Sequence, residues 1–203
     1  MVFSLEGCRN NELAVNAPNK TKQAIAYEQL EPASYITIDT NMAPKMEEVR
    51  VDMADMKVES GPVELLTSVG SCVAICLHDP LHKCGGLAHI MLPYSGDVSN
   101  EPLPSKYADT AIPALLNGIE KINGKESRLL AKIAGGANMF ANLNPQNLDI
   151  GGKNVRAVKA LLQKYRISLR GEDVGGSHGR RITFNVESGV VTIKCFNGET
   201  RKL

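Results

Sequence analysis

Residues 69–80 read VGSCVAICLHDP, and both the predicted fold and the predicted site follow from this segment. A glycine and a serine precede Cys72, which is typical of a tight turn that leads into a regular element. A second apolar run, residues 87–92 (LAHIML), is bounded by glycines and by Pro93, and it predicts a strand that carries His89. Each of the two segments therefore presents one reactive side chain.

A cysteine at a glycine turn and a histidine on a nearby buried strand are what thiol catalysis requires. The thiolate is the nucleophile, and a free thiol with a pKa of about 8.5 is mostly protonated at neutral pH. An adjacent imidazole takes that proton and later returns it to the leaving group. The alternative is structural, since free cysteines are among the most buried residues and a histidine in an apolar strand is commonly a core residue. The pattern alone leaves both interpretations open.

The composition argues against several other classes of protein. Lysine and arginine total 23 against 22 acidic residues, so bulk charge indicates neither a nucleic-acid nor a membrane surface. No apolar run approaches the roughly 18 residues of a membrane helix. The first residues are too polar for a signal peptide, and we therefore expect a cytoplasmic protein. Five cysteines, an odd number, fit a reducing compartment better than a disulfide framework.

The periodicity of the chain predicts an α+β fold, a mixed sheet with flanking helices. Apolar positions recur at helical spacing over residues 107–122 and again over 150–165. Strands are predicted at residues 47–53, 63–69, 129–134, 167–169, 181–186 and 189–196. Strands and helices are interleaved without a regular strand–helix–strand rhythm, which favours a mixed sheet over a doubly wound one.

Two segments divide the chain by composition. Residues 1–45 mix Asn, Lys, Pro and Glu and are predicted to be a poorly ordered extension. The folded domain is expected over residues 46–203, because the 203-residue length favours one domain over two.

A zinc site is a competing interpretation of the central region. Cysteines and histidines, which can bind zinc, cluster within eighteen residues at Cys72, Cys76, His78, His82, Cys84 and His89. The spacing lacks the paired cysteine knuckles of structural zinc sites, and Cys76 alternates with apolar residues as a core position would. We therefore expect neither a metal nor an organic cofactor.

Four other polar residues have simple local explanations. We interpret Lys132 as a strand-end lysine rather than a substrate contact, and Asp173 as a turn-forming aspartate rather than a residue that orients the site. We interpret Asn154 as a capping or locally hydrogen-bonded residue and His178 as solvent-facing.

An ordered series of motifs resembles a known family, the chemoreceptor glutamine deamidases called CheD. The motifs are residues 70–73 (GSCV), 79–80 (DP), 85–93 (GGLAHIMLP), 106–109 (KYAD), 132–137 (KIAGGA), 150–151 (IG), Asn154, 173–176 (DVGG) and 179–180 (GR). The resemblance covers the chain from about residue 46 onward and leaves residues 1–45 without a counterpart. It implies a layered α/β fold with a cysteine–histidine site, similar to the catalytic domains of glutamine-deamidating toxins.

The resemblance also implies roles for individual residues. Cys72 would be the nucleophile and His89 the acid/base. The family's third member is a threonine upstream of the cysteine that orients the imidazole, and in some members it lies six residues before the cysteine, where this chain has Leu66. Thr67 is the nearest candidate, while Ser68 lies on the same strand face as position 66.

The chain also differs from the family pattern at the family's opening strand, where it has Asp52 and Ala54 in place of the usual glycines.

By the same resemblance, the chain would convert glutamines of chemotaxis receptors to glutamate with release of ammonia. The irregular residues 94–105 are our candidate for contacts with the receptor. The family also binds a phosphatase partner, CheC. The alternative function is therefore a docking module that keeps the fold and regulates a CheC-type phosphatase.

Overall fold

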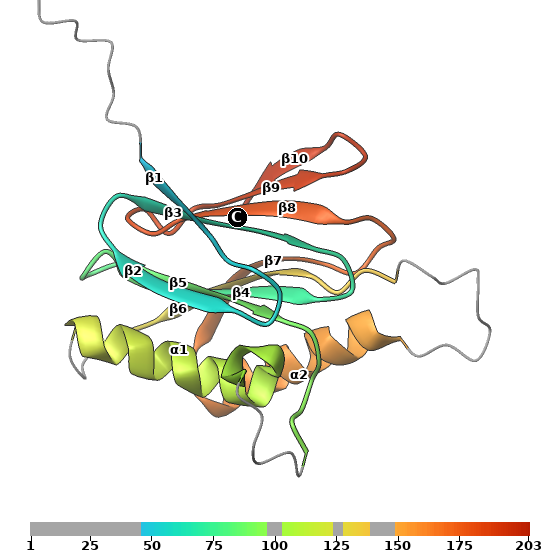
Figure 1. Cartoon of the computed structure of the whole chain (residues 1–203), viewed down its shortest axis with the longest axis horizontal. Coiled ribbons are helices and arrows are strands. Elements are labelled where there is room, and N and C mark those ends of the chain that lie inside the picture. Colours follow the sequence, from blue (N-terminus) through green and yellow to red (C-terminus); the bar gives the residue numbers. More distant parts are fainter. Residues whose placement is uncertain (1–45, 97–102, 124–127, 139–148) are drawn as a thin grey trace, which may run out of the picture. The chain divides into compact units, whose positions relative to one another are not determined.

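The structure is a computed structural model, and it describes residues 46–96, 103–123, 128–138 and 149–203 (Figure 1). The predicted extension, residues 1–45, lies outside the described residues. In chain order the elements are β1 (Glu47–Arg50), β2 (Met56–Ser60), β3 (Val63–Val69), β4 (Val73–Asp79), β5 (Cys84–Ile90), a 3-10 turn η1 (Pro104–Lys106), α1 (Ala108–Asn123), β6 (Leu130–Gly135), α2 (Ile150–Lys164), β7 (Ser168–Val174), β8 (Arg180–Asn185), β9 (Val191–Cys195) and β10 (Thr200–Lys202).

The described strands form two sheets, each with parallel and antiparallel pairs. Sheet A has the order β1-β3-β8-β9-β10, with β1 and β3 parallel and the other neighbours antiparallel. Sheet B has the order β2-β5-β4-β6-β7, with only β6 and β7 parallel among these described strands. The predicted α+β class is therefore confirmed, although the mixed pairing is divided between two sheets.

Sheet B is the middle of three layers, with sheet A on one face and both α-helices on the other (Figure 1). One core lies between sheet B and the helices and includes Ile75, Ile112 and Leu162. A second core lies between the sheets and includes Leu65 and Phe184. Every residue of β4 and β5 is buried, because both faces of these strands are covered. Two sheets were hard to predict from the sequence because such strands lack the alternation that reveals a covered and an exposed face.

A turn separates β1 from β2 and explains one wrong prediction. The strand predicted over residues 47–53 ends at Arg50, and the amide of Asp55 donates to the carbonyl of Asp52 across 3.1 Å. Ala54 has a φ of 59°, a conformation that glycine adopts readily and alanine rarely. A glycine at this position, as the family resemblance implied, would suit the same turn. Strand β2, which follows, has no counterpart among the predicted strands.

Both predicted helices are present and pack on sheet B. Helix α2 begins at an aspartate cap, where the carboxylate of Asp149 accepts from the amide of Gly152 at 2.8 Å. The apolar face of α1 is shorter than predicted, because Ile122 is 46% exposed. Within the described ranges, no helix is long and apolar enough to cross a membrane.

We predict that Phe184→Ala strongly destabilises the protein. Phe184 is fully buried between the sheets, and truncating a buried phenylalanine typically costs about 3–5 kcal/mol. Phe196→Ala is the matched control, since that ring is 68% exposed and its loss should change the free energy of unfolding by about 0.5 kcal/mol or less. Urea unfolding of the two variants measures the difference. Equal effects would contradict the placement of Phe184 in the core between the sheets.

Candidate active site

The candidate site lies where the chain crosses from one sheet to the other. Strand β3 of sheet A ends at Val69 and β4 of sheet B begins at Val73, so residues 70–72 make the crossing. Cys72 is therefore in a short turn, as predicted, and its half-buried side chain packs against the core between the sheets. His89 is on β5, and the predicted strand is confirmed.

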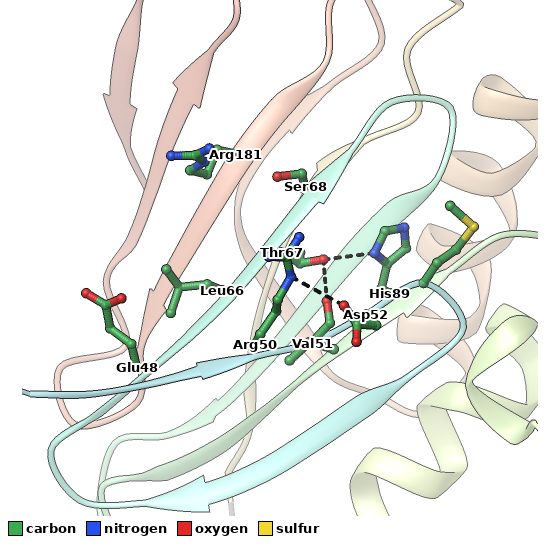
Figure 2. A pocket seen from close by; sticks show the side chains of 10 residues that line it. Glu48, Arg50, Val51, Asp52, Leu66, Thr67, Ser68, His89 and Arg181 are labelled. Carbon is green, nitrogen blue, oxygen red and sulfur yellow. Dashed lines mark hydrogen bonds and ion pairs between the residues drawn. The ribbon is translucent and has the colours of Figure 1, made fainter.

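Thr67 connects the two sheets through a hydrogen bond to His89. Its hydroxyl oxygen lies 2.8 Å from Nδ1 of His89 and 2.8 Å from the carbonyl oxygen of Val51 (Figure 2). Both Thr67 and His89 are buried, with exposed fractions of 6% and 3%. The contact is thus shielded from solvent and orients the imidazole.

The contact with Val51 decides which nitrogen of His89 carries the proton. A threonine hydroxyl has a single hydrogen, and a carbonyl oxygen can only accept, so Thr67 donates to Val51. The hydroxyl must then accept from the imidazole, which places the hydrogen of the neutral ring on Nδ1. Nε2 is left with a free lone pair, and it is buried without a hydrogen-bond partner in the described part of the chain. His89 therefore has one unprotonated nitrogen available as a base.

Burial keeps the imidazole of His89 neutral. Desolvation lowers its pKa below the ordinary value, and the negative charge of Asp52 opposes this shift to a lesser extent. The main chain of His89 is also held, because its amide donates to Asp55 (3.0 Å) and its carbonyl accepts from Ala54 (3.1 Å). The turn between β1 and β2 thus fixes the backbone of the histidine, while Thr67 fixes its ring.

The pairing of β4 with β5 places Cys72 on the same face as His89. Ala74 lies directly opposite His89, and Cys72 precedes Ala74 by two residues. Cys72 and Ala74 both pack against the core between the sheets, so Cys72 lies on the same side of sheet B as His89. The side chains predicted to react are thus on adjacent segments and face the same core.

Burial favours the neutral form of the Cys72 thiol. It raises the pKa of the thiol, and a hydrogen bond from its own backbone amide acts in the opposite direction with a smaller effect. Because the pKa of the thiol is raised and that of His89 is lowered, both side chains are neutral near pH 7.

A glycine segment holds the turn that carries Cys72. The amide of Gly136 donates to the carbonyl of Cys72 at 2.7 Å, and the amide of Ala137 donates to Gly70 at 2.8 Å. A β-carbon at Gly135 would lie 2.2 Å from the carbonyl oxygen of Cys72, and the residue has a φ of 119°. Only glycine allows this approach. The KIAGGA motif thus supports the position of Cys72.

A solvent-accessible hollow of about 550 Å³ reaches Thr67 and His89 (Figure 2). Its wall consists of residues from β1, β3, β5 and β8 and from the turn after β1, which are Glu48, Arg50, Val51, Asp52, Met53, Leu66, Thr67, Ser68, His89 and Arg181. Arg50, Asp52 and Arg181 are exposed and bring both signs of charge to the rim. Cys72 is not part of this wall, and Nε2 of His89 is itself buried.

Comparison with known proteins identifies the family. Residues 91–195 match the family model described as CheD chemotactic sensory transduction. The chain belongs to the CheD family. It is 45% identical to a protein of Desulforamulus reducens over an alignment of 149 residues, and this alignment covers 72% of this chain and 90% of that protein. It is 46% identical over 151 residues to one of Clostridium novyi (73% and 93%) and 44% identical over 146 residues to one of Methanococcus maripaludis (72% and 94%). Each of these is named a probable chemoreceptor glutamine deamidase CheD.

In this CheD chain the threonine that contacts the histidine lies five residues before the cysteine. The odd-numbered positions of β3 face the core, and Thr67 shares their face, whereas Ser68 is exposed and Leu66 is half-buried on the other face. The alternation of Val63, Leu65 and Val69 in the sequence indicates the inward face. That pattern distinguishes Thr67 from Ser68 without a structure.

Two of the local explanations expected for other CheD residues are wrong. Asn154 neither caps nor bonds locally: its Nδ2 donates to the carbonyls of Ser71 (3.1 Å) and Met91 (2.9 Å), which are distant in sequence. Asp173 lies inside β7, where it is buried and paired with Arg180 at 2.8 Å. Sequence reasoning missed both because long-range partners leave no local pattern.

The position of Lys132 also differs from the prediction, whereas the exposure of His178 agrees with it. Lys132 lies inside β6 rather than at its end, and its ammonium donates to the main-chain oxygens of Gly189 and Leu203 at 2.6 and 2.8 Å. His178 is exposed, as expected.

The cysteines and histidines of the zinc alternative are separated by the fold. Cys76 belongs to the core between the sheets, whereas Cys84 belongs to the core under the helices. His82 bonds Asp79 at 2.7 Å near the surface. Among the described residues, no group of three or more His, Cys, Asp or Glu side chains could hold a metal ion.

We predict that His89 makes the protein less stable in weak acid. The unfolded chain binds a proton at this residue near the ordinary pKa of about 6.5, whereas the folded chain does so only at lower pH. The free energy of unfolding therefore falls as the pH drops below about 6.5 towards the folded pKa. His78, whose pKa burial also lowers, adds to the same fall.

Urea unfolding at about pH 7.5 and pH 5.5 tests this prediction. The loss of stability between the two values should be smaller in His89→Gln than in the wild type. His178→Gln is the control, since this exposed side chain should not change the loss. An equal loss in His89→Gln and the wild type would show that His89 is not kept neutral by the fold.

Proposed function

We propose that this chain is a chemoreceptor glutamine deamidase, the activity for which its relatives are named. It hydrolyses the side-chain carboxamide of specific receptor glutamines to glutamate and ammonia. Cys72 is the nucleophile, His89 is the acid/base and Thr67 orients His89. The observation that carries this proposal is the buried, unpartnered Nε2 of His89, whose lone pair the Thr67 contact leaves free on the face shared with Cys72.

Attack and proton transfer occur together. The sulfur of Cys72 forms a bond to the carboxamide carbon while its proton moves to Nε2 of His89. The carbonyl π bond breaks and its electron pair moves to the oxygen, which gives a tetrahedral oxyanion. His89 is then imidazolium, with Nδ1 still donating to Thr67. The neutral resting pair thus becomes a charged pair only when a substrate is attacked.

The imidazolium next supplies the proton that the leaving group needs. An amide anion is a very poor leaving group, so Nε2 protonates the nitrogen as the carbon–nitrogen bond breaks and ammonia leaves. A thioester to Cys72 remains. Nε2 then accepts a proton from water, whose oxygen attacks the thioester, and the carbon–sulfur bond breaks to release glutamate and restore the thiol. Water is the only co-reactant, so the reaction requires no metal or organic cofactor.

The oxyanion needs a hydrogen-bond donor close to the sulfur. The backbone amide of Cys72 is the candidate, because it belongs to the residue that carries the sulfur. Removing one such donor typically lowers the rate on the order of a hundred-fold. The carbonyls of Cys72 and Gly70 already accept from the amides of Gly136 and Ala137.

The receptor is expected to contact residues 94–105. The candidate contact region, residues 94–105, lies partly outside the described residues. Its described start is anchored, since Ser95 donates through its amide and its hydroxyl to Asp109. Tyr94 next to it is 56% exposed and is available for contact with another protein. We also expect a CheC-type phosphatase partner and a cytoplasmic location.

The first test measures deamidation of a receptor cytoplasmic fragment by peptide mass spectrometry. The wild type should convert specific glutamines to glutamate, whereas Cys72→Ala should convert none because it lacks the nucleophile. Cys195→Ala is the matched control, since Cys195 is also half-buried but lies in β9, two strands from Val69 in sheet A. It should keep the wild-type rate.

Either of two results would contradict the proposal. Conversion by Cys72→Ala at the wild-type rate would exclude the thiol mechanism. No conversion by the wild type, together with measurable binding of the receptor fragment or of a CheC-type phosphatase, would favour the docking module instead.

The second test concerns Thr67. Thr67→Val keeps the shape but removes the hydroxyl, so His89 loses the partner that fixes its ring and its tautomer. We expect kcat to fall by at least about 10- to 100-fold, the loss that is typical when a metal-bound histidine loses the partner that orients its ring. Thr67→Ser should recover most of the rate, because it keeps the hydroxyl.

Ser68→Ala is the control for the Thr67 test. Ser68 is the adjacent residue, but it is exposed on the opposite face of β3, so its loss should leave kcat unchanged. If Ser68→Ala were slow and Thr67→Val were as fast as the wild type, the assignment of the third residue would be reversed.

A further inference from the structure

We infer that Asn154 is a positioning residue, which sets the distance between Cys72 and His89 by holding the main chain beside each of them. This inference rests on the proposed function of these two side chains. Asn154 is on α2 and is fully buried. Its Nδ2 donates to the carbonyl of Ser71, which precedes Cys72, and to the carbonyl of Met91, which follows His89 by two residues.

Asn154 acts where the pairing of the two strands stops. The ladder between β4 and β5 ends at the pair Val73 and Ile90. Beyond this pair the amide of Leu92, which would continue the ladder opposite Ser71, donates to Lys106 at 3.1 Å instead. The ladder therefore does not hold the segment that contains Cys72 against the segment that follows His89. The two bonds from Asn154 connect these segments instead.

The geometry of one amide nitrogen makes this connection rigid. Nδ2 has two hydrogens in a fixed plane, and the distances of 3.1 and 2.9 Å use both of them. A change in the separation of Ser71 and Met91 would stretch at least one bond. Two carbonyls that share one donor group are thus kept at a set distance.

Close packing brings α2 near enough for this short side chain to reach. A β-carbon at Gly151 would lie 2.4 Å from the carbonyl oxygen of Gly136, and one at Gly136 would lie 2.3 Å from Val155. The start of α2 therefore rests directly on the segment whose Gly136 amide bonds the carbonyl of Cys72. Asn154 and Gly136 together hold consecutive carbonyls of the turn, those of Ser71 and Cys72.

The amide of Asn154 is not explained by packing alone. Its Oδ1 is buried and has no hydrogen-bond partner among the described residues. An unsatisfied buried acceptor is destabilising by about 1–3 kcal/mol, which an apolar residue at the same position would avoid. An aspartate would present no donor to the two carbonyls. The side chain of Asn154 is therefore suited to binding the carbonyls of Ser71 and Met91, although its own oxygen is left without a hydrogen bond.

The test compares Asn154→Ala with Asn123→Ala in the full chain, using the receptor fragment as substrate. Asn123 is a matched control because it is also a helical asparagine whose Nδ2 bonds to β4, but at Asp79, the opposite end of that strand from Cys72. We expect kcat of Asn154→Ala to fall on the order of a hundred-fold with KM within about twofold, because a small displacement of reacting groups slows chemistry more than binding. Asn123→Ala should keep kcat.

Alkylation of Cys72 by iodoacetamide provides a readout that needs no substrate and that a purely structural role would not change. Peptide mass spectrometry follows the rate at Cys72 as a function of pH. In the wild type the rate should follow the titration of His89, because Nε2 accepts the thiol proton. In Asn154→Ala this dependence should be lost, while in Asn123→Ala it should be kept.

The outcomes separate this inference from the proposed function. Equal kcat values for Asn154→Ala and Asn123→Ala, a change confined to KM, or an unchanged alkylation profile would each overturn the role of Asn154. If Asn154→Ala does not fold, Asn154→Ser replaces it under the same criteria, and it should be less impaired because its hydroxyl can hold one carbonyl. If the wild type does not deamidate the receptor, the proposed function fails and the alkylation profiles alone decide whether Asn154 positions the thiol.

Discussion

The site depends on a single hydroxyl group, that of Thr67, which donates one hydrogen bond and accepts another. Thr67 has one hydrogen to give, and the carbonyl of Val51 takes it, so the imidazole of His89 must donate from Nδ1. This contact joins sheet A to sheet B and leaves Nε2 as the free base. The tautomer of the histidine is thus a consequence of how β1 and β3 are arranged, since Val51 follows the strand that pairs with β3.

Burial shifts the pKa values of the two proposed catalytic groups in opposite directions. It raises the pKa of the Cys72 thiol and lowers that of the His89 imidazole, because in each case it disfavours the charged form. A preformed ion pair is therefore not the resting state. Under the proposed mechanism, this neutral pair separates charge only when a carboxamide is in place to be attacked.

The turn that carries Cys72 is short, and it is held from outside by neighbouring segments. Gly136 and Ala137 bond its carbonyls from the end of β6, and Asn154 bonds it from α2. The segment around Gly135 and Gly136 is in turn bonded to the next loop, where the amide of Gly175 donates to Gly135 and Arg180 bonds the carbonyl of Gly175. Motifs that are far apart in the sequence thus support the turn of Cys72 through a series of hydrogen bonds.

The sequence alone determined the local features of this protein. It indicated both helices, most strands, the turn at Cys72 and the strand of His89, because these depend on periodicity and on glycine positions that neighbouring residues display. The inward face of β3, which selects Thr67 over Ser68, was also visible in the alternation of apolar residues. What only the tertiary structure decided was the division into two sheets, the contact of Thr67 with both Val51 and His89, and the distant partners of Asn154 and Asp173. These features join residues far apart in the chain, and no local pattern records which buried polar groups will meet when the layers pack.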